Sequence, residues 1–246
     1  MLWLVSSQKD QPDMTGLDSL APQRAPNAQR PLLGMTVLAV EDSRYASEAL
    51  RLMCLRSGAR IRRADCLASA RRHLQVYRPS AVIVDLGLPD GRGEELIAEL
   101  DRATPRVGVI LATSGDAGAE ARARSAGADG LLLKPVASLG IFQQEVLRHV
   151  PADRRPLGPY VVQDDRINPD PLAYRDDLEH VQSLLSHDRS PDILIYAAQF
   201  LASVARAAND AVLADAASGL AGHCPEAGIA RVSGLIATRL AQQEAM

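Results

Sequence analysis

Apolar and polar positions alternate regularly between residues 35 and 150. Short runs of Val, Ile, Leu and Ala end in polar residues, and each run is followed by a segment with apolar residues at helical spacing. The short runs predict strands at about 36–40, 61–64, 81–85, 107–114 and 130–135. The other segments predict helices at about 44–57, 67–77, 94–102 and 138–150, and one that ends at Gly127. By the right-handed crossover rule, this order predicts an α/β fold with a five-stranded, doubly wound parallel sheet.

Two segments outside this region have no apolar period. Residues 6–31 are rich in Gln, Pro, Asp, Ser and Arg, so we expect residues 1–34 to be a flexible segment ahead of a domain at 35–150. Prolines at 151, 156, 159, 169 and 171 indicate that residues 151–171 form a linker.

The remaining residues, 172–246, have helical periodicity. They predict helices at about 172–186, 191–208, 210–219 and 226–243, and these would pack as a small antiparallel bundle. Ser190 is suited to the N-cap of the second helix and Pro191 to its first position. The apolar stripe of that helix consists of Ile193, Tyr196, Ala197, Phe200, Leu201 and Val204.

The charge of the chain differs between its two parts. Residues 1–150 carry 19 Lys and Arg against 17 Asp and Glu, whereas residues 151–246 carry 8 against 13. A helix-turn-helix at 215–239 fits the spacing, but the acidic balance argues against binding to a phosphate backbone. We therefore favour protein interaction for this part of the chain and keep DNA binding, as in a transcriptional regulator, as the alternative.

Cysteine usage and hydropathy restrict the class of protein further. Cys54, Cys66 and Cys224 have no C-x-x-C spacing, which argues against a disulfide framework or a zinc site. No apolar run approaches the length of a membrane span, and the opening MLWLVSS is too short for a signal peptide. We expect a soluble cytoplasmic protein.

The ends of the predicted strands carry the candidate chemistry. Asp85 ends a strand that is apolar throughout, and because Asp often starts a turn, this residue alone could simply end the strand. However, Glu41 and Asp42 follow the first strand, and the carboxyl ends of parallel strands meet at one edge of a sheet. Converging carboxylates and open positions suit Mg²⁺. Thr113 and Lys134, at two further strand ends, would meet phosphoryl oxygens.

Residues 35–150 resemble a receiver domain of the two-component response regulators. The matching features are Glu41-Asp42, VIVD ending at Asp85, Leu88-Pro89 with Gly93, Thr113-Ser114, Gly127 to Asp129, and Lys134-Pro135. Lys9 and Lys134 are the only lysines beside 25 arginines, so a lysine at position 134 is not background usage. In one departure from the family pattern, Leu131 stands where an aromatic residue is usual.

The resemblance implies a function for each of these residues. Asp85 would take a phosphoryl group from a phosphohistidine on a histidine kinase or histidine phosphotransfer protein. Mg²⁺ would be bound by Asp42, Asp85 and the carbonyl of Gly87, with Glu41 acting through water. Lys134 and Thr113 would bind the phosphoryl group. The protein would be a signalling phosphoacceptor rather than an enzyme, with at most self-catalysed phosphotransfer and autodephosphorylation.

Arginines are frequent in the first half of this region. They are Arg44, Arg51, Arg56, Arg60, Arg62, Arg63, Arg71 and Arg72. Such a run is often only a solvated surface. The functional alternative is a docking surface for an acidic pair of partner helices, and the first helix of receivers is where the family's kinases usually pack.

The C-terminal part is weakly similar to the central hairpin of histidine phosphotransfer domains. Where those domains have a histidine followed by a lysine and a glycine, this chain has Gln199, Ala202 and Ser203. His180, His187 and His223 lack that lysine and glycine and are interpreted as ordinary surface histidines. We therefore expect a degenerate phosphotransfer-like domain that acts in docking or homodimerisation. We expect it neither to accept phosphate nor to bind DNA.

Two other classes fit the sequence less well. A haloacid-type aspartyl-phosphate hydrolase needs a second Asp two residues after its nucleophile, where this chain has Gly87. A pseudo-receiver would be expected to have lost site residues, and none is missing.

Overall fold

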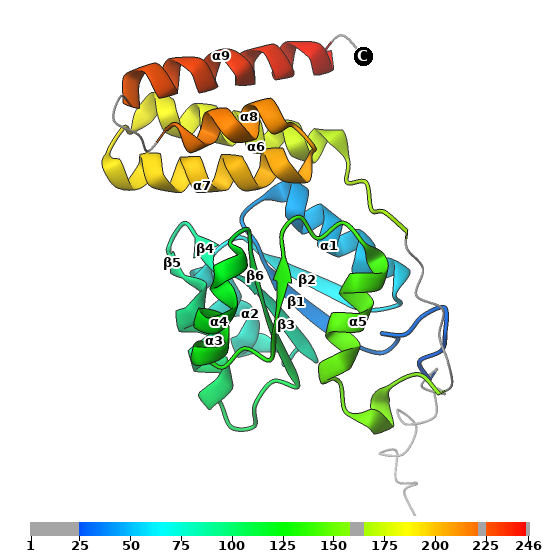
Figure 1. Ribbon diagram of the computed structural model, residues 1–246. Helices are drawn as coiled ribbons and strands as arrows, with labels where there is room; N and C mark the ends of the chain where they lie inside the picture. Colours follow the sequence, from blue (N-terminus) through cyan, green and yellow to red (C-terminus); the bar gives the residue numbers. More distant parts are fainter. Residues whose placement is uncertain (1–24, 158–164, 221–224, 245–246) are drawn as a thin grey trace, which may run out of the picture.

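The computed structural model describes residues 25–157, 165–220 and 225–244. An α/β domain is followed by a bundle of helices that lies over one edge of its sheet (Figure 1). Predictions for most of the segment 6–31, part of the linker, Cys224 and His223 fall outside the described residues. In the described part, no helix is long and apolar enough to cross a membrane.

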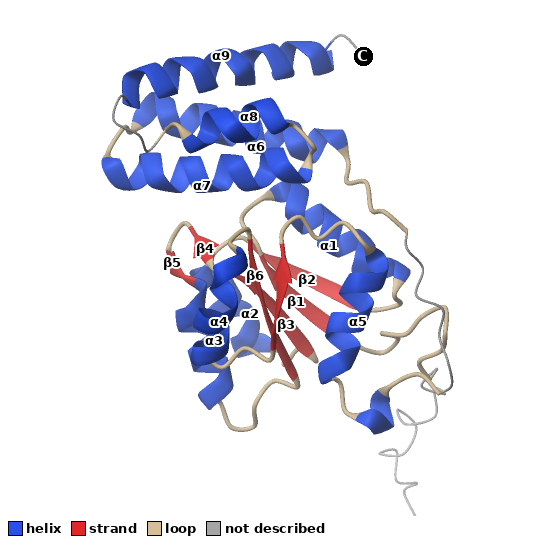
Figure 2. Ribbon diagram, viewed as in Figure 1, coloured by secondary structure: helices blue, strands red, loops and turns tan. Residues whose placement is uncertain are grey.

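The sheet has the predicted strands in a doubly wound order. Its strands are β1 (Thr36–Val40), β2 (Arg60–Ala64), β3 (Ala81–Asp85), β6 (Val109–Ser114) and β7 (Gly130–Leu133). They are parallel, in the order β2-β1-β3-β6-β7, and Figure 2 shows them between two layers of helices. β3 and β6 are buried throughout, as strands covered on both faces must be.

Helices cover both faces of the sheet. One face packs against α1 (Arg44–Arg56) and α5 (Leu139–His149), and the other against α2 (Leu67–Val76), α3 (Gly93–Arg102) and α4 (Glu120–Ala126). Gly127 ends α4 in the left-handed conformation, at φ 105°. The hydrophobic layers therefore have the arrangement that the apolar periodicity predicts.

The structure corrects the N-terminal boundary of this domain. We predicted a flexible segment up to residue 34, but Leu32 is fully buried and its amide donates to the carbonyl of Ser57 at 2.9 Å. The packed part therefore begins before residue 35. A short antiparallel hairpin, β4 (Gly87–Leu88) and β5 (Gly91–Arg92), was also not predicted.

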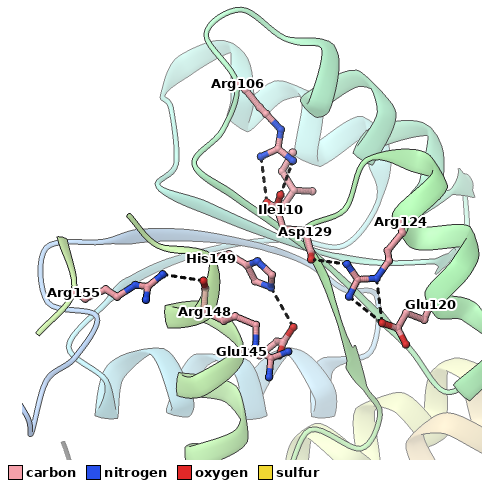
Figure 3. A network of polar contacts seen from close by, with 9 residues as sticks. All are labelled: Arg106, Ile110, Glu120, Arg124, Asp129, Glu145, Arg148, His149 and Arg155. Carbon is pink, nitrogen blue, oxygen red and sulfur yellow. Dashed lines mark hydrogen bonds and ion pairs between the residues drawn. The ribbon is translucent and has the colours of Figure 1, made fainter. Parts of the chain in front are cut away.

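A polar network holds the edge of the sheet that lies away from the bundle (Figure 3). Asp129 accepts two hydrogen bonds from the guanidinium of Arg106, at 2.9 and 3.2 Å. It also accepts one from the amide of Ile110 at 2.7 Å. Paired bonds to one carboxylate fix the geometry of both groups, so this network ties the loop before β7 to β6.

The C-terminal bundle consists of α6 (Pro171–His187), α7 (Pro191–Ala207), α8 (Ala211–Ser218) and α9 (Pro225–Glu244). Its core is built from Leu, Val, Ile and Ala with Phe200 and Tyr174. Ser190 takes the predicted N-cap position of α7, but its hydroxyl makes no capping hydrogen bond. Asp210 caps α8 and pairs with Arg239 of α9 at 2.8 and 3.1 Å, which links the last two helices.

Candidate functional site

The carboxyl ends of the strands bring the predicted acidic residues together. Glu41 and Asp42 follow β1, and Asp85 is the last residue of β3. One carboxylate oxygen from each of the three lies within 4.8 Å of the other two. Gly93 closes the hairpin after Asp85, where a Cβ would collide with the carbonyl of Asp85, so only glycine fits there.

The ammonium group of Lys134 lies within this cluster. Its Nζ is 2.7 Å from Oε2 of Glu41 and 2.9 Å from Oδ2 of Asp85, and the side chain is only 9% exposed. Burial alone would lower the pKa of Lys134, but the two carboxylates outweigh it and raise the pKa overall. The lysine is therefore charged and offsets part of the repulsion between the carboxylates.

Glu41 and Asp42 hold their protons more firmly than exposed acids do. Burial raises the pKa of Glu41 to about 8, against the effect of the Lys134 ammonium. Burial and the charge of Asp85 raise the pKa of Asp42 to about 6. Carboxylates in such a cluster are stabilised by a cation.

Oxygen ligands in this arrangement fit Mg²⁺. The three carboxylates supply hard anionic donors, and Mg²⁺ is usually held by one or two carboxylates together with waters and phosphate oxygens. Gly87 follows Asp85 by two residues, and both residues line one cavity together with Glu41 and Asp42. The structure thus places all four residues of the predicted metal set at one end of the sheet.

Thr113 lies beside Asp85, because the two residues are paired in the register of β3 and β6. Its side chain is buried, and Oγ1 has no hydrogen-bond partner in the described structure. A buried hydroxyl without a partner costs about 1–3 kcal/mol. Its position next to Asp85 and Lys134 is suited to a ligand that accepts a hydrogen bond.

The helical bundle makes direct contact with this site, which the sequence did not predict. Tyr196 of α7 donates a hydrogen bond from its hydroxyl to Oδ2 of Asp42 at 2.7 Å. Burial and the carboxylate of Asp42 raise the pKa of Tyr196. The sequence places Tyr196 in the apolar stripe of this helix, but its hydroxyl contacts the α/β domain of the same chain.

A buried carboxylate from α6 attaches the bundle to the first turn of α1. Asp177 accepts hydrogen bonds from Oγ of Ser43 at 2.7 Å, from the amide of Arg44 at 2.8 Å and from the amide of Tyr45 at 3.0 Å. Only 2% of Asp177 is exposed. These donors belong to the free N-terminus of a helix, where a negative charge is favourable. Ser43 also caps α1 itself, by accepting from the amide of Ala46.

Two weaker contacts surround this anchor. Arg44 pairs with Asp176 of α6 at 2.6 Å, in an ion pair that is largely exposed to solvent. The rings of Tyr45 and Tyr174 meet edge to face, with centroids 5.7 Å apart. Arg44, one arginine of the predicted docking surface, therefore pairs with an acidic helix of the same chain.

Two large cavities open where the bundle meets the α/β domain. One of about 450 Å³ contains Asp85 and Lys134, and α7 forms its other wall through Tyr196, Gln199, Phe200, Ser203, Val204 and Arg206. A cleft of about 1070 Å³ lies between α1 and α6 and also reaches Glu41 and Asp42. The acidic site is therefore covered but still accessible to small molecules.

The two histidines of the bundle that the structure describes lie on its surface. His180 is exposed and packs against the ring of Phe200, with centroids 5.6 Å apart. His187 is exposed and contacts the carbonyl of Ser183 at 2.8 Å. Neither lines the cavity that contains Asp85, whereas Gln199 does.

Asp177 and Tyr196 are the site residues that sequence reasoning missed. For Asp177 the sequence does contain a signal. It lies on the apolar stripe of α6, beside Leu178 and between Tyr174 and Val181, where a carboxylate is out of place unless it has a partner. Tyr196 looked like an ordinary member of an apolar stripe, and nothing local distinguishes it.

Comparison with known proteins finds a family match for the α/β domain. Residues 37–144 match the family model of the response regulator receiver domain. The chain is similar to the KDP operon transcriptional regulatory protein KdpE of Escherichia coli, with 33% identity over 99 residues, which are 40% of this chain and 44% of that protein. KdpE of Mycobacterium tuberculosis is 31% identical over the same shares. The chain spans less than half the length of these relatives.

Among solved structures, a putative response regulator from Chloroflexus aurantiacus is 28% identical with a TM-score of 0.41, covering 46% of this chain and 92% of that one.

Proposed function

We propose that the protein, whose residues 37–144 form a response regulator receiver domain of a two-component system, accepts a phosphoryl group on Asp85 and signals through its C-terminal bundle. The donor is a phosphohistidine on a histidine kinase or a histidine phosphotransfer protein. The observation that carries the proposal is the environment of Asp85. It combines a lysine ammonium at 2.9 Å, two further carboxylates and an unpartnered buried hydroxyl.

The chain's own residues account for the steps of the transfer. An oxygen of Asp85 attacks phosphorus, the phosphorus–nitrogen bond of the donor breaks, and the bond to Asp85 forms. The electron pair of the broken bond stays on the departing nitrogen, which is protonated from solvent. Asp42, Asp85 and the carbonyl of Gly87, with Glu41 through water, would hold a Mg²⁺ ion, which would neutralise negative charge during the transfer.

Lys134 and Thr113 then bind the transferred group. Lys134 is held between Glu41 and Asp85 and can exchange the Asp85 contact for a phosphoryl oxygen. Thr113 donates its free hydroxyl to another oxygen. The protein acts as a phosphoacceptor with at most autodephosphorylation, not as an enzyme with its own substrate turnover.

We propose an output through protein interaction. The curated relatives are named transcriptional regulators, but they are matched over 99 residues only. The part of this chain after residue 150 has 13 acidic against 8 basic residues, which opposes contact with nucleic-acid phosphates. A gel shift at low salt tests this choice, and specific retention of DNA would favour the transcriptional alternative.

Self-association through the bundle remains part of the proposal. The edge of α7 at Tyr196 is occupied within the chain, so a second copy would use other apolar positions. Ile195 and Val212 are exposed, at 46% and 53%. Light scattering of the full chain tests this, and a strict monomer at high concentration would contradict it.

The test of the phosphoacceptor uses phosphoramidate, a small donor that can enter the 450 Å³ cavity. Intact-mass spectrometry should detect one added phosphoryl group with Mg²⁺ and none after chelation. Asp85→Asn should gain no mass under either condition. A phosphoryl group on the Asp85→Asn variant would refute the assignment.

A further inference from the structure

The face of α7 over the acidic site carries hydrogen-bond donors and no carboxylate. Tyr196, Gln199, Ser203 and Arg206 occur at steps of three and four residues, so they lie on one side of the helix. All four line the cavity that contains Asp85. We call these residues the α7 donor face.

Most of this face has no partner. Tyr196 bonds to Asp42, but the side chains of Gln199, Ser203 and Arg206 make no hydrogen bond or ion pair with any described residue. Gln199 and Arg206 are exposed and Ser203 is half-buried, so water solvates these side chains. They can exchange that water for a polar ligand in the cavity without breaking a contact within the protein.

Arg206 lies close to the end of β6. Its Nη1 is 3.3 Å from the place where a Cβ on Gly115 would be, two residues after Thr113. Ser203 also lines a cavity of about 40 Å³ with Thr113 and Lys134. The buried Thr113 hydroxyl is likewise unpartnered. Hydrogen-bond donors without a protein partner therefore lie near Asp85 on both domains, Ser203 and Arg206 on α7 and Thr113 on β6.

Phosphorylation would change the charge opposite the α7 donor face. It replaces one carboxylate charge by nearly two negative charges and adds three acceptor oxygens. A guanidinium forms its strongest hydrogen bonds with such oxygens.

We propose that the α7 donor face is the second wall of the phosphoryl site, in which Gln199, Ser203 and Arg206 bind the phosphoryl group on Asp85. Phosphorylation then tightens the bundle on the receiver instead of releasing it. The signal then reaches the bundle by direct contact with the phosphoryl group. Such a contact does not need the aromatic residue that is usual in the family at the position of Leu131. This inference rests on the proposed function of Asp85.

The opposite response has a physical basis too. Added negative charge beside Asp42 could break the Tyr196 hydrogen bond and expel α7. The two responses predict opposite changes in the amide exchange rates where α1 meets the bundle. The amides of Arg44 and Tyr45 donate to Asp177 of the bundle, so their exchange with solvent reports whether the bundle is docked.

The experiment measures amide hydrogen exchange at Arg44 and Tyr45 by NMR in the full chain. Samples contain Mg²⁺ with or without phosphoramidate, and intact mass gives the fraction phosphorylated. We expect exchange at both amides to slow roughly tenfold on phosphorylation, the effect of one charge-assisted hydrogen bond. Arg206→Ala should lose most of this slowing, and Arg206→Lys should keep part of it.

Arg231→Ala is the matched control. Arg231 is an exposed arginine on α9, a helix that packs on α6 and α8, so its loss should leave the slowing unchanged. Faster or unchanged exchange in the phosphorylated protein would overturn the inference, as would full slowing in Arg206→Ala. Absence of the phosphoryl mass would instead refute the proposed function, and the inference with it.

Discussion

Removing the carboxylate of Asp177 should detach the bundle without unfolding α1. Asp177 is the one residue of α6 that accepts hydrogen bonds from two amides and a hydroxyl at the start of α1. In Asp177→Ala these donors lose their partner. The helix keeps its own cap, because the hydroxyl of Ser43 still accepts from the amide of Ala46 at 3.0 Å.

The size of the effect follows from these contacts. Loss of a capping side chain costs about 0.5–2 kcal/mol, and a charge at a partly buried helix N-terminus adds up to about 2 kcal/mol. Burial of Asp177, which raises its pKa, offsets part of the gain. We expect Asp177→Ala to weaken docking by about 1.5–3 kcal/mol. Asp177→Asn, which keeps one acceptor oxygen but not the charge, should lose about half as much.

The neighbouring residue provides the control. Asp176 pairs with Arg44 at 2.6 Å, but the two side chains are 40% and 72% exposed. Exposed pairs contribute about 0–1 kcal/mol, so Asp176→Ala should change little.

Two assays measure the loss. Urea denaturation followed by circular dichroism should become less cooperative in Asp177→Ala, with the bundle unfolding before the receiver. Amide exchange at Arg44 and Tyr45 should become faster by at least tenfold. Equal effects of Asp176→Ala and Asp177→Ala would refute the reasoning, because burial and the three-donor geometry would then add nothing.

Three further predictions concern single contacts. Tyr196→Phe should lower the free energy of docking by about 1 kcal/mol through loss of the 2.7 Å bond to Asp42, measured by the same urea transitions, and no change would show that the bond is not formed in solution. Lys134→Arg should bind Mg²⁺ almost normally by calorimetry but lose the exchange response to phosphorylation, since a planar guanidinium cannot replace a compact ammonium; a full response would argue against its role. The Arg239 guanidinium lowers the pKa of Asp210 below 3.8, so this pair stabilises the bundle above that pH, and the stabilisation disappears as the pH falls through the lowered pKa. Wild-type protein should thus lose more stability between pH 5 and pH 3 than Asp210→Asn, in urea titrations at both pH values.

The acidic site was predictable from the sequence for a topological reason. Apolar runs in alternation with helical segments define a parallel sheet, and the C-terminal ends of parallel strands meet at one edge. Asp85, Glu41 and Lys134 were therefore expected at the same edge, and in the folded protein they are in contact there. The four helices of the bundle were predictable for a similar reason, since each has its own cap or apolar period.

The sequence alone determined the parallel sheet, the group of residues at its edge and the existence of a second, helical domain. Only the tertiary structure decided where that domain lies. Asp177 and Ser43 are 134 positions apart, and Tyr196 and Asp42 are 154 apart. Periodicity reports which side of a helix is apolar within a few turns, but it contains no information about which distant surface the helix meets. That choice depends on the fit of a few donors and acceptors across a linker, and such pairs become visible only when the chain is folded.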